Sequence, residues 1–452
     1  MLKNVKTAWD IETVRKKLLI MLLILVVFRL GNAITVPFIN YETLQQTSAM
    51  TQGLFGIFNL MSGGAFAMAT LFALGVQPYI NASIIIELLC IAIPSLGELQ
   101  KEGGEIGKKK VKYITYALTG ALAILQAVGY YLLMRRYTII TKTGFGPALL
   151  ICFLLVLGAA AVTALGELGT KKGIGNGISF ILLVGILSRV PNGIANIISG
   201  TSTWLGMRNI SVETLTEQGI SEEAARNYLS SGTAPWETAL IIVGVIALTL
   251  FIIYVQGAER RIPIQYAKRN VGNKLYGGQS TFLPIKVAMA GVLPIIFAQS
   301  LLGIPSTVFA FTGDPAKGTF FYPLYSMVTN RNAVYIVLYL VLLVLMTYFQ
   351  VYTQVDPIEL SNRLRNNGAM VPGYRPGKPT TELLKYNIDR VAFIGAVYIA
   401  VIAILPILAD HFTMQSLAIG GTSLIITVSV ILELHEAIKT QNQMNSYRGF
   451  MK

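Results

Sequence analysis

Ten long apolar runs alternate with polar segments along the chain. Each run has about the length of 20 apolar residues that a helix needs to cross a bilayer. The pattern therefore predicts an all-α polytopic membrane protein with ten transmembrane helices. The runs are residues 18–36, 76–94, 113–134, 147–165, 174–190, 236–255, 282–304, 333–355, 391–408 and 416–434.

One apolar stretch, residues 62–86, is not a clean membrane helix. Gly75 and Pro78 interrupt it, and Asn81 lies inside its second half. Residues 54–67, which overlap its start, can form only a helix too short to span a membrane. Irregular backbone at membrane depth occurs only where it is buried in protein or lines a water-filled path. The sequence therefore predicts a re-entrant element at 54–67 beside a passage through the membrane.

Composition excludes an ordinary soluble domain. Hydrophobic residues make up 54% of the 452 residues and charged residues only 13%, whereas soluble domains are usually about a quarter charged. If the N-terminus is inside, 27 of the 36 Lys and Arg residues lie in or beside inner segments, and 8 lie on the outer side. This asymmetry predicts that both termini are cytoplasmic. Arg135, Arg136 and Lys142 are outer exceptions.

The runs and their connections predict five parts. They are a cytoplasmic N-terminal segment (1–17), an N-terminal half with five helices (18–190), an external loop (191–235), a C-terminal half with five helices (236–434) and a cytoplasmic tail (435–452). The C-terminal half includes two cytoplasmic loops at about 256–280 and 356–389.

The two halves share short sequence patterns. Residues 75–82 and 291–298 both read G-V-x-P-x-I-x-A. Residues 177–179 (GIS) match 421–423 (GTS), with Leu182 and Ile426 at corresponding positions. Run 2 thus matches run 7, and run 5 matches run 10. A five-helix unit that recurs in the opposite orientation is typical of transport proteins whose pathway lies at the repeat interface.

Catalytic chemistry is poorly represented. The two histidines, His411 and His435, are predicted near opposite membrane faces, and the chain has no Walker A sequence. The glycines of residues 173–177 (GIGNG) follow no predicted strand, which argues against a dinucleotide site. An intramembrane enzyme is therefore disfavoured, and neither a metal nor a cofactor is predicted.

The predicted pathway positions are mostly Val and Ile, with few polar groups near the midplane. Aliphatic constrictions gate by dewetting and recognise no particular chemical group, which suits an extended polypeptide. A secondary transporter of a small solute is the alternative, and it would need a saturable site at the midplane. The basic loops, which include ERRIPIQYAKR (259–269) and residues 363–378, are either solvated positive-inside loops or docking sites for RNA phosphate or an acidic protein surface.

Six motifs occur in order along the chain, namely MSGGAFAMATLFALGVQPYINASIIIELL, KKGIGNGISFILLVGI, ERRIPIQYAKR, STFLPIKVAMAGVLPIIFAQS, GAMVPGYRPGKPT and GGTSLIITVSVILE. Together they resemble motifs of the SecY family of protein translocation channels. The resemblance covers nearly the whole chain. It implies two five-helix halves around an hourglass pore, through which unfolded secretory polypeptides pass and from which apolar segments leave sideways into the lipid.

The resemblance also implies roles for particular residues. The waist of the pore would be Val76, Ile80, Ile178, Leu182, Ile296 and Ile426. The plug, at about 54–67, would include Leu54, Phe58, Leu60, Met61, Ser62, Gly63, Gly64 and Ala67. The lateral gate would include Asn81, Glu87 and Gln299, although Glu87 stands where the family usually has a neutral polar residue.

The implied partners lie in the membrane and the cytoplasm. They are the membrane subunits SecE and SecG, the motor ATPase SecA, the ribosome, signal peptides, unfolded preproteins and the lipid bilayer. The implied location of the chain is the plasma membrane. The residues implied to meet SecA or the ribosome are Arg260, Arg261, Lys268, Arg269, Arg363, Arg365 and Arg375.

Overall fold

The computed structural model describes residues 11–46, 56, 58–59, 61–101, 104–207, 234–266, 269–271, 274–276, 280–312, 319, 322–329, 333–413 and 421–450. The chain forms two compact units. The first comprises Met1–Gly193, Gly303–Asn330 and Val430–Lys452, and the second comprises Ile194–Leu302 and Arg331–Ser429. Several predictions lie wholly or partly outside the described residues, namely those for residues 1–10, Leu54, Leu60, most of the loop 191–235, Lys268 and the start of the tenth run.

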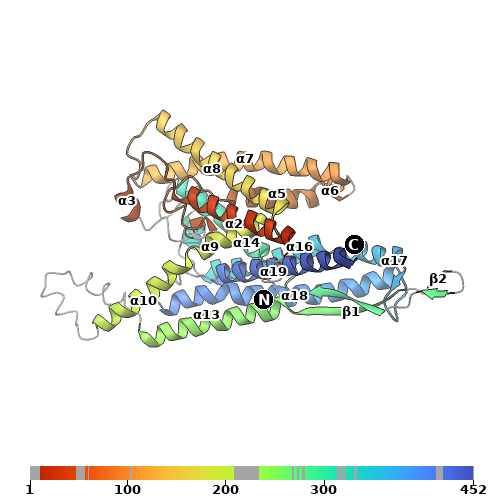
Figure 1. Cartoon of the computed structure of the whole chain (residues 1–452). Coiled ribbons are helices and arrows are strands. Elements are labelled where there is room, and N and C mark those ends of the chain that lie inside the picture. The colour runs from red at the N-terminus through yellow and green to blue at the C-terminus, as the bar shows by residue number, and fades with distance from the viewer. Residues whose placement is uncertain are drawn as a thin grey trace. The chain divides into compact units, whose positions relative to one another are not determined.

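The first unit is built on neighbouring helices that pack in chain order. Helix α5 packs on α7, α7 on α8, and α8 on α9, and Figure 1 shows α7 and α8 side by side. Small buried residues such as Ala123, Ala127 and Ala159 let the helix axes approach closely. The helices are α2 (Glu12–Ala33), α3 (Tyr41–Gln46), α5 (Gln77–Ala92), α6 (Pro94–Lys101), α7 (Gly104–Arg136), α8 (Phe145–Lys172), α9 (Gly177–Leu187) and α15 (Tyr322–Thr329).

The second unit combines long helices with a small sheet. Helix α16 packs against α18, and α17 packs against both α18 and β5. Its elements are α13 (Pro235–Gln256), β1 (Glu259–Tyr266), β2 (Arg269–Val271), β3 (Lys274–Tyr276), β4 (Ser280–Lys286), α16 (Ala333–Gln354), α17 (Pro357–Asn366), β5 (Ala369–Met370) and α18 (Lys378–Thr413). The unit boundary falls inside α10 (Val190–Met207), α14 (Leu293–Thr312) and α19 (Gly421–Phe450).

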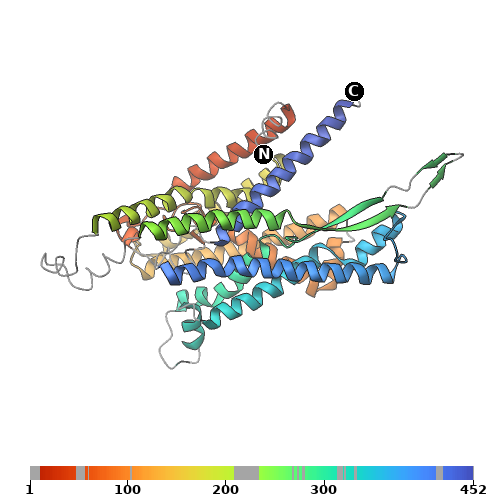
Figure 2. The same ribbon diagram turned by 90° about the horizontal axis from the view of Figure 1, so that it is seen from below.

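The sheet orders its strands β4-β1-β5, and both pairings are antiparallel. Figure 2 shows α13 leading into the long strands of this sheet. Ile262 and Ile264 on β1 are 5% and 3% exposed, and Ile285 on β4 is 2% exposed. Their neighbours in the strands point to solvent. This alternation is the pattern of a strand with one buried face.

Six helices in the described part of the chain are long and apolar enough to cross a membrane, or seven if the bent pair α5 and α6 counts as one span. That pair bends by 111°. Helix α2 contains Lys16, Lys17 and Arg29, which lower its mean hydropathy. The predicted predominantly helical, multi-pass character is confirmed, whereas the count of ten helices stays a prediction.

Several helices extend beyond the predicted apolar runs. Helix α8 continues through residues 166–172, after the end of the run 147–165, and α10 occupies the start of the predicted loop 191–235. The predicted run 282–304 is not one helix, because β4 occupies its start and α14 begins only at Leu293. Helix α14 continues past residue 304, and α15 follows it along the chain before the next predicted run. The tail after residue 434 is helical to Phe450. Hydropathy marks only the apolar length of a helix, so polar helix ends are missed.

Candidate functional site

The backbone turn before α5 is set by Gly75. Its φ of 54° is one that glycine adopts without a Cβ penalty, and its N–H donates to the Phe72 carbonyl at 2.9 Å. Pro78 lies in the first turn of α5, where a missing N–H costs nothing. Val76 and Ile80 are 2% and 6% exposed. The break in the apolar stretch is therefore a helix start.

The turn before α14 has the same construction. Gly291 has a φ of 61°, and its N–H donates to the Ala288 carbonyl at 3.1 Å. Helix α14 begins two residues after this glycine, as α5 does after Gly75. The fourth residue of the helix, Ile296, is buried, and its N–H donates to the Val292 carbonyl at 3.4 Å. The G-V-x-P-x-I-x-A pattern thus encodes one local structure twice.

Helices α9 and α19 also begin alike. Each starts at the glycine of its shared motif, and Leu182 and Ile426, both buried, are the sixth residues of their helices. The Asn176 side chain caps α9 by accepting from the Ile178 N–H at 3.0 Å, which satisfies an otherwise unpaired donor of the first turn. Ile178 itself is half-buried against Gly166 of α8.

The six predicted waist residues are divided between the two units. Val76, Ile80, Ile178 and Leu182 belong to the first unit, whereas Ile296 and Ile426 belong to the second. Each lies within six residues of the start of α5, α9, α14 or α19. Repeated placement at helix starts is the feature that these residues share.

A run of turns, residues 62–76, precedes α5 and forms much of its own hydrogen-bond network. The Asn59 carbonyl accepts from Gly64 N at 2.8 Å, and its side-chain Oδ1 accepts from Ala67 N at 2.9 Å. Ser62 Oγ donates to the Asn59 carbonyl at 3.2 Å and accepts from Phe66 N at 3.0 Å. Asn59 and residues 61–67, named here the turn segment, are thereby held as one folded piece.

Few polar contacts join the turn segment to its surroundings. Asn32 Nδ2 donates to the Ser62 carbonyl at 3.1 Å, and Ser188 Oγ donates to the Gly63 carbonyl at 3.3 Å. A Cβ on Gly185 would lie 2.7 Å from the Met61 carbonyl oxygen, so α9 and the turn segment approach as closely as backbones can. The contact depends on the absence of a side chain at position 185.

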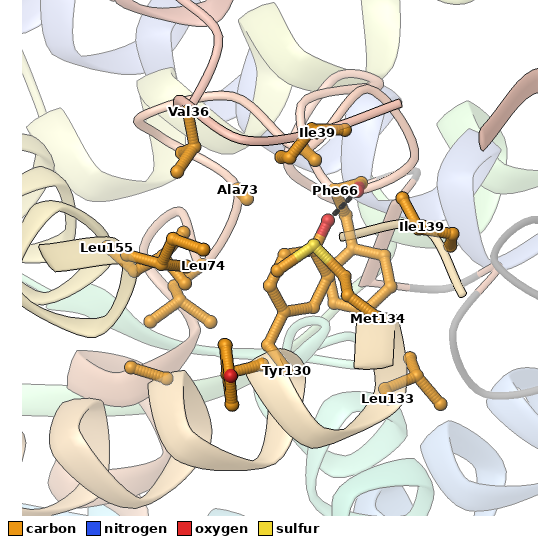
Figure 3. Packing of buried hydrophobic residues seen from close by; sticks show 14 of the residues in the cluster. Val36, Ile39, Phe66, Ala73, Leu74, Tyr130, Leu133, Met134, Ile139 and Leu155 are labelled. Atoms are coloured by element: carbon orange, nitrogen blue, oxygen red, sulfur yellow. Dashed lines mark hydrogen bonds between the residues drawn. The ribbon is translucent and has the colours of Figure 1, made fainter. Parts of the chain in front are cut away.

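The chain after the turn segment, residues 69–71, is held by backbone hydrogen bonds to residues 34–36. Ala69 O accepts from Val36 N at 3.0 Å, Leu71 N donates to the Ile34 carbonyl at 2.8 Å, and Thr70 forms a bridge with Thr35. In Figure 3 the Tyr130 hydroxyl reaches the Phe66 carbonyl from α7, within a buried apolar cluster. The turn segment is therefore anchored at its C-terminal end.

The predicted gate residues lie on two helices of different units. Asn81 and Glu87 are half-buried on α5. Gln299 lies on α14, where its Nε2 donates to the Tyr339 hydroxyl of α16 at 3.4 Å. The described contacts therefore show Gln299 bonded within its own unit.

The sheet brings the two basic segments together. Gln265 and Tyr266 of β1 pair with Met370 and Ala369 of β5, so residues 259–266 lie beside the loop that leads to Arg375. Both segments were predicted to be loops, and the sheet was not predicted. Alternation of isoleucine with polar residues in RIPIQY was the available signal.

The described cationic side chains of these segments are exposed, which suits them for an acidic partner. They are Arg260, Arg261, Arg363, Arg365 and Arg375. Arg261 pairs with Glu259 at 2.7 Å and Arg363 with Glu359 at 2.6 Å. Exposed pairs of this kind contribute little to stability. Arg269 begins β2, and Lys268 lies outside the described residues.

Four contacting residues of the turn segment were missed from the sequence, namely Asn59, Tyr130, Ser188 and Arg189. The Nη1 atom of Arg189 lies 3.2 Å from the position that a Cβ on Gly64 would occupy. An arginine next to an apolar run is a signal that could have found Arg189, because such charges are costly at membrane depth. Asn59 and Tyr130 carry no comparable sequence signal.

The long apolar helices define a multi-pass membrane protein. Two of its helices, α5 and α14, follow glycine turns and bury an isoleucine near their starts. The family model of SecY matches residues 70–435. A protein translocase subunit SecY from Streptomyces galbus is 36% identical over 469 residues, covering 100% of both chains. The chain belongs to the SecY family.

Solved channel structures share the fold. "The structure of a protein conducting channel" matches with a TM-score of 0.59 at 19% identity, covering 94% of this chain and 92% of that one. "Sec61 in the Canine ribosome-channel complex from the endoplasmic reticulum" matches with a TM-score of 0.55 at 18% identity and the same coverages. Family membership makes the chain a protein-conducting translocation channel and not an enzyme, and it does not favour a small-solute transporter.

Proposed function

We propose that the six aliphatic residues at the starts of α5, α9, α14 and α19 form the waist of the polypeptide pathway. The observation that carries this proposal is the duplicated glycine turn, which twice starts a helix and buries the isoleucine in its fourth position. Aliphatic side chains at a constriction expel water and so block ions. They also make no specific bond, so an extended chain of any sequence can pass.

The turn segment is the stopper of this pathway. Its own hydrogen bonds keep it folded, and only a few bonds join it to α2 and α9. Its C-terminal anchor at residues 69–71 sharpens the predicted limits of 54–67, because movement is easiest before the anchor. Displacing the segment breaks its few bonds to α2 and α9 and the Tyr130–Phe66 bond, and it removes Phe66 from the buried apolar cluster, while it leaves the internal network intact.

The proposed arrangement of ten helices in two halves also defines a lateral gate, the membrane topology and the partner subunits. Helices α5 and α14, with Asn81, Glu87 and Gln299, border a lateral gate through which sufficiently apolar segments partition into lipid. Both termini lie in the cytoplasm, and the membrane is the plasma membrane. SecE and SecG are the partner subunits there.

The exposed arginines around β1 and Arg375 receive the SecA ATPase or the ribosome, which supply the driving force. Two observations support this partner class. The sheet joins the two basic segments, and a channel of the same fold occurs in the ribosome complex described above. Phosphate-rich RNA and acidic protein surfaces both attract such clusters.

Conductance of planar bilayers tests the waist. Replacing both Ile80 and Ile296 with Ser is expected to raise the resting ion leak, because hydroxyl groups hold water in the constriction. Ile124→Ser on α7, where the side chain is 57% exposed, is the matched control and is expected to leave the leak unchanged. An unchanged leak in the double variant would remove these residues from the waist.

Translocation into vesicles tests the docking surface. Arg375→Glu is expected to abolish SecA-driven translocation while the channel stays folded, because an acidic side chain repels an acidic partner. Lys378→Glu makes the same charge change at an exposed position three residues away and is expected to have the smaller effect. Normal translocation by Arg375→Glu contradicts the assignment.

A further inference from the structure

The connection between α7 and α8 carries cations on the side where the rest of the chain has few. Arg135 and Arg136 end α7, and Lys142 precedes α8 by three residues. All three residues are exposed. They are the outer exceptions to an otherwise strong positive-inside distribution, so their presence calls for a cause other than topology.

The loop that holds these cations is ordered by backbone pairing. Thr141 N donates to the Phe38 carbonyl at 2.9 Å, Asn40 N donates to the Ile139 carbonyl at 2.8 Å, and Ile39 bridges Ile140. Lys142 Nζ lies 5.7 Å from the centre of the Phe38 ring. The cationic end is thus a fixed surface of the first unit.

The charge at this end of the first unit is positive. No Asp or Glu occurs between Glu105 and Glu167, and these two residues lie at the far ends of α7 and α8. Glu42 on α3 follows the paired loop and adds one negative charge. Three cations against one carboxylate leave an excess that favours an anionic ligand.

An apolar stripe runs along α8 from the same end. Phe145, Leu149, Phe153 and Leu157 are spaced four residues apart and are 84%, 57%, 60% and 46% exposed. Side chains at this spacing lie on one helix face. At about 1.5 Å per residue the stripe is about 18 Å long, close to half of the roughly 30 Å hydrocarbon core. This is the length of one acyl chain.

We propose that this surface binds one anionic phospholipid. Its charged headgroup lies against Arg135, Arg136 and Lys142, and an acyl chain lies along the α8 stripe. Two features favour a lipid as the ligand. The cations complement an anionic headgroup at one end, and the exposed apolar stripe is about as long as one leaflet is thick. Assignment to the outer leaflet rests on the proposed orientation of the chain, whereas the preference for anionic lipid does not.

Photocrosslinking of the full chain in phosphatidylcholine nanodiscs tests the proposal. The probes are phosphatidylglycerol and phosphatidylcholine, each with a diazirine in its acyl chain. The expected result is that the phosphatidylglycerol probe labels residues 145–157 severalfold more than the phosphatidylcholine probe. The Arg135→Gln/Lys142→Gln variant is expected to be labelled equally by the two probes, because each cation near an anionic headgroup is worth about fivefold in affinity and removing two therefore abolishes a severalfold preference.

Two control variants separate charge from folding. Arg135→Lys/Lys142→Arg keeps both charges and is expected to keep the preference. Lys109→Gln/Lys110→Gln removes two exposed charges near the other end of α7 and is expected to keep it too. Equal labelling by the two probes, or a preference that survives Arg135→Gln/Lys142→Gln, overturns the proposal. Failure of both probes to label 145–157 also overturns it, because something other than lipid then covers the stripe.

Discussion

The glycine turns before α5 and α14 share their backbone but not their surroundings. Both glycines have positive φ, and the N–H of each donates a hydrogen bond to the carbonyl three residues earlier, Phe72 or Ala288. A Cβ on Gly75 would lie 3.6 Å from the Ser62 Cβ, whereas no described atom lies within 4 Å of the Cβ position of Gly291. One turn is packed under the turn segment, and the other is open.

The difference lies in what the chain does before each turn. Before Gly75 it folds into the turn segment, and before Gly291 it runs through strand β4 of the basic sheet. Under the proposed function, the same helix start follows the stopper in one unit and the docking surface in the other. A duplicated framework keeps its helix starts, and the segments that lead into them carry the separate functions.

The largest effect is expected from filling the contact between α9 and the turn segment. Gly185→Val places a side chain 2.7 Å from the Met61 carbonyl oxygen, and overpacking of this kind typically costs about 1–3 kcal/mol. The turn segment is expected to be displaced, with a higher ion leak in planar bilayers and a lower thermal stability. Gly244→Val on α13, where no described atom lies within 4 Å, is the matched control. A closed, fully stable Gly185→Val channel would show that this contact does not hold the stopper.

An intermediate effect is expected inside the turn segment. Asn59→Ala removes the acceptor of the Ala67 N–H, and a buried donor left unpaired costs about 1–3 kcal/mol. The leak is expected to rise less than in Gly185→Val. Thr347→Ala in the second unit removes a buried hydroxyl that donates to the Leu343 carbonyl within α16 and is expected to leave the leak unchanged. Equal leaks in the two variants would argue against a stopper confined to the first unit.

The smallest effect is expected from replacing the two turn glycines, one at a time. Gly75→Ala and Gly291→Ala force a Cβ into the left-handed region, at about 1–2 kcal/mol each. We expect similar losses of thermal stability, because the strain is the same. Only Gly75→Ala is expected to raise the leak, since only its turn packs on the turn segment. A leak from Gly291→Ala would remove the functional difference between the turns.

Sequence patterns predicted the long helices and the start of α5, because apolar length and glycine-proline punctuation are local signals, but they misplaced the starts of α7, α14 and α18. Gly75 interrupts the apolar stretch in the sequence, and in the structure it lies two residues before the start of α5. The sheet was missed because its strands lie in short basic segments far apart in the chain. Ile262 and Ile264 become a buried face only when β4 and β5 pair with β1.

The turn segment shows the same limit. Plug roles for Ser62, Gly63 and Gly64 are implied by the family resemblance and stay predictions, whereas the contacts of Asn59 and Tyr130 were not predicted. Their roles depend on hydrogen bonds to backbone atoms of the turn segment, which a linear pattern does not reveal. Helix ends such as residues 166–172 were also missed, since polar residues can continue a helix beyond the apolar part of the membrane.

Crosslinking of a stalled secretory protein tests the central claim most directly. A photoactivatable residue is placed at position 80 or 296, and a reporter preprotein is arrested halfway through the membrane. The account predicts that both positions crosslink to the arrested chain, while control positions 124 and 243, exposed on α7 and α13, do not. Crosslinks at the control positions equal to those at 80 and 296, or none at 80 and 296, would contradict a polypeptide pathway through these helix starts.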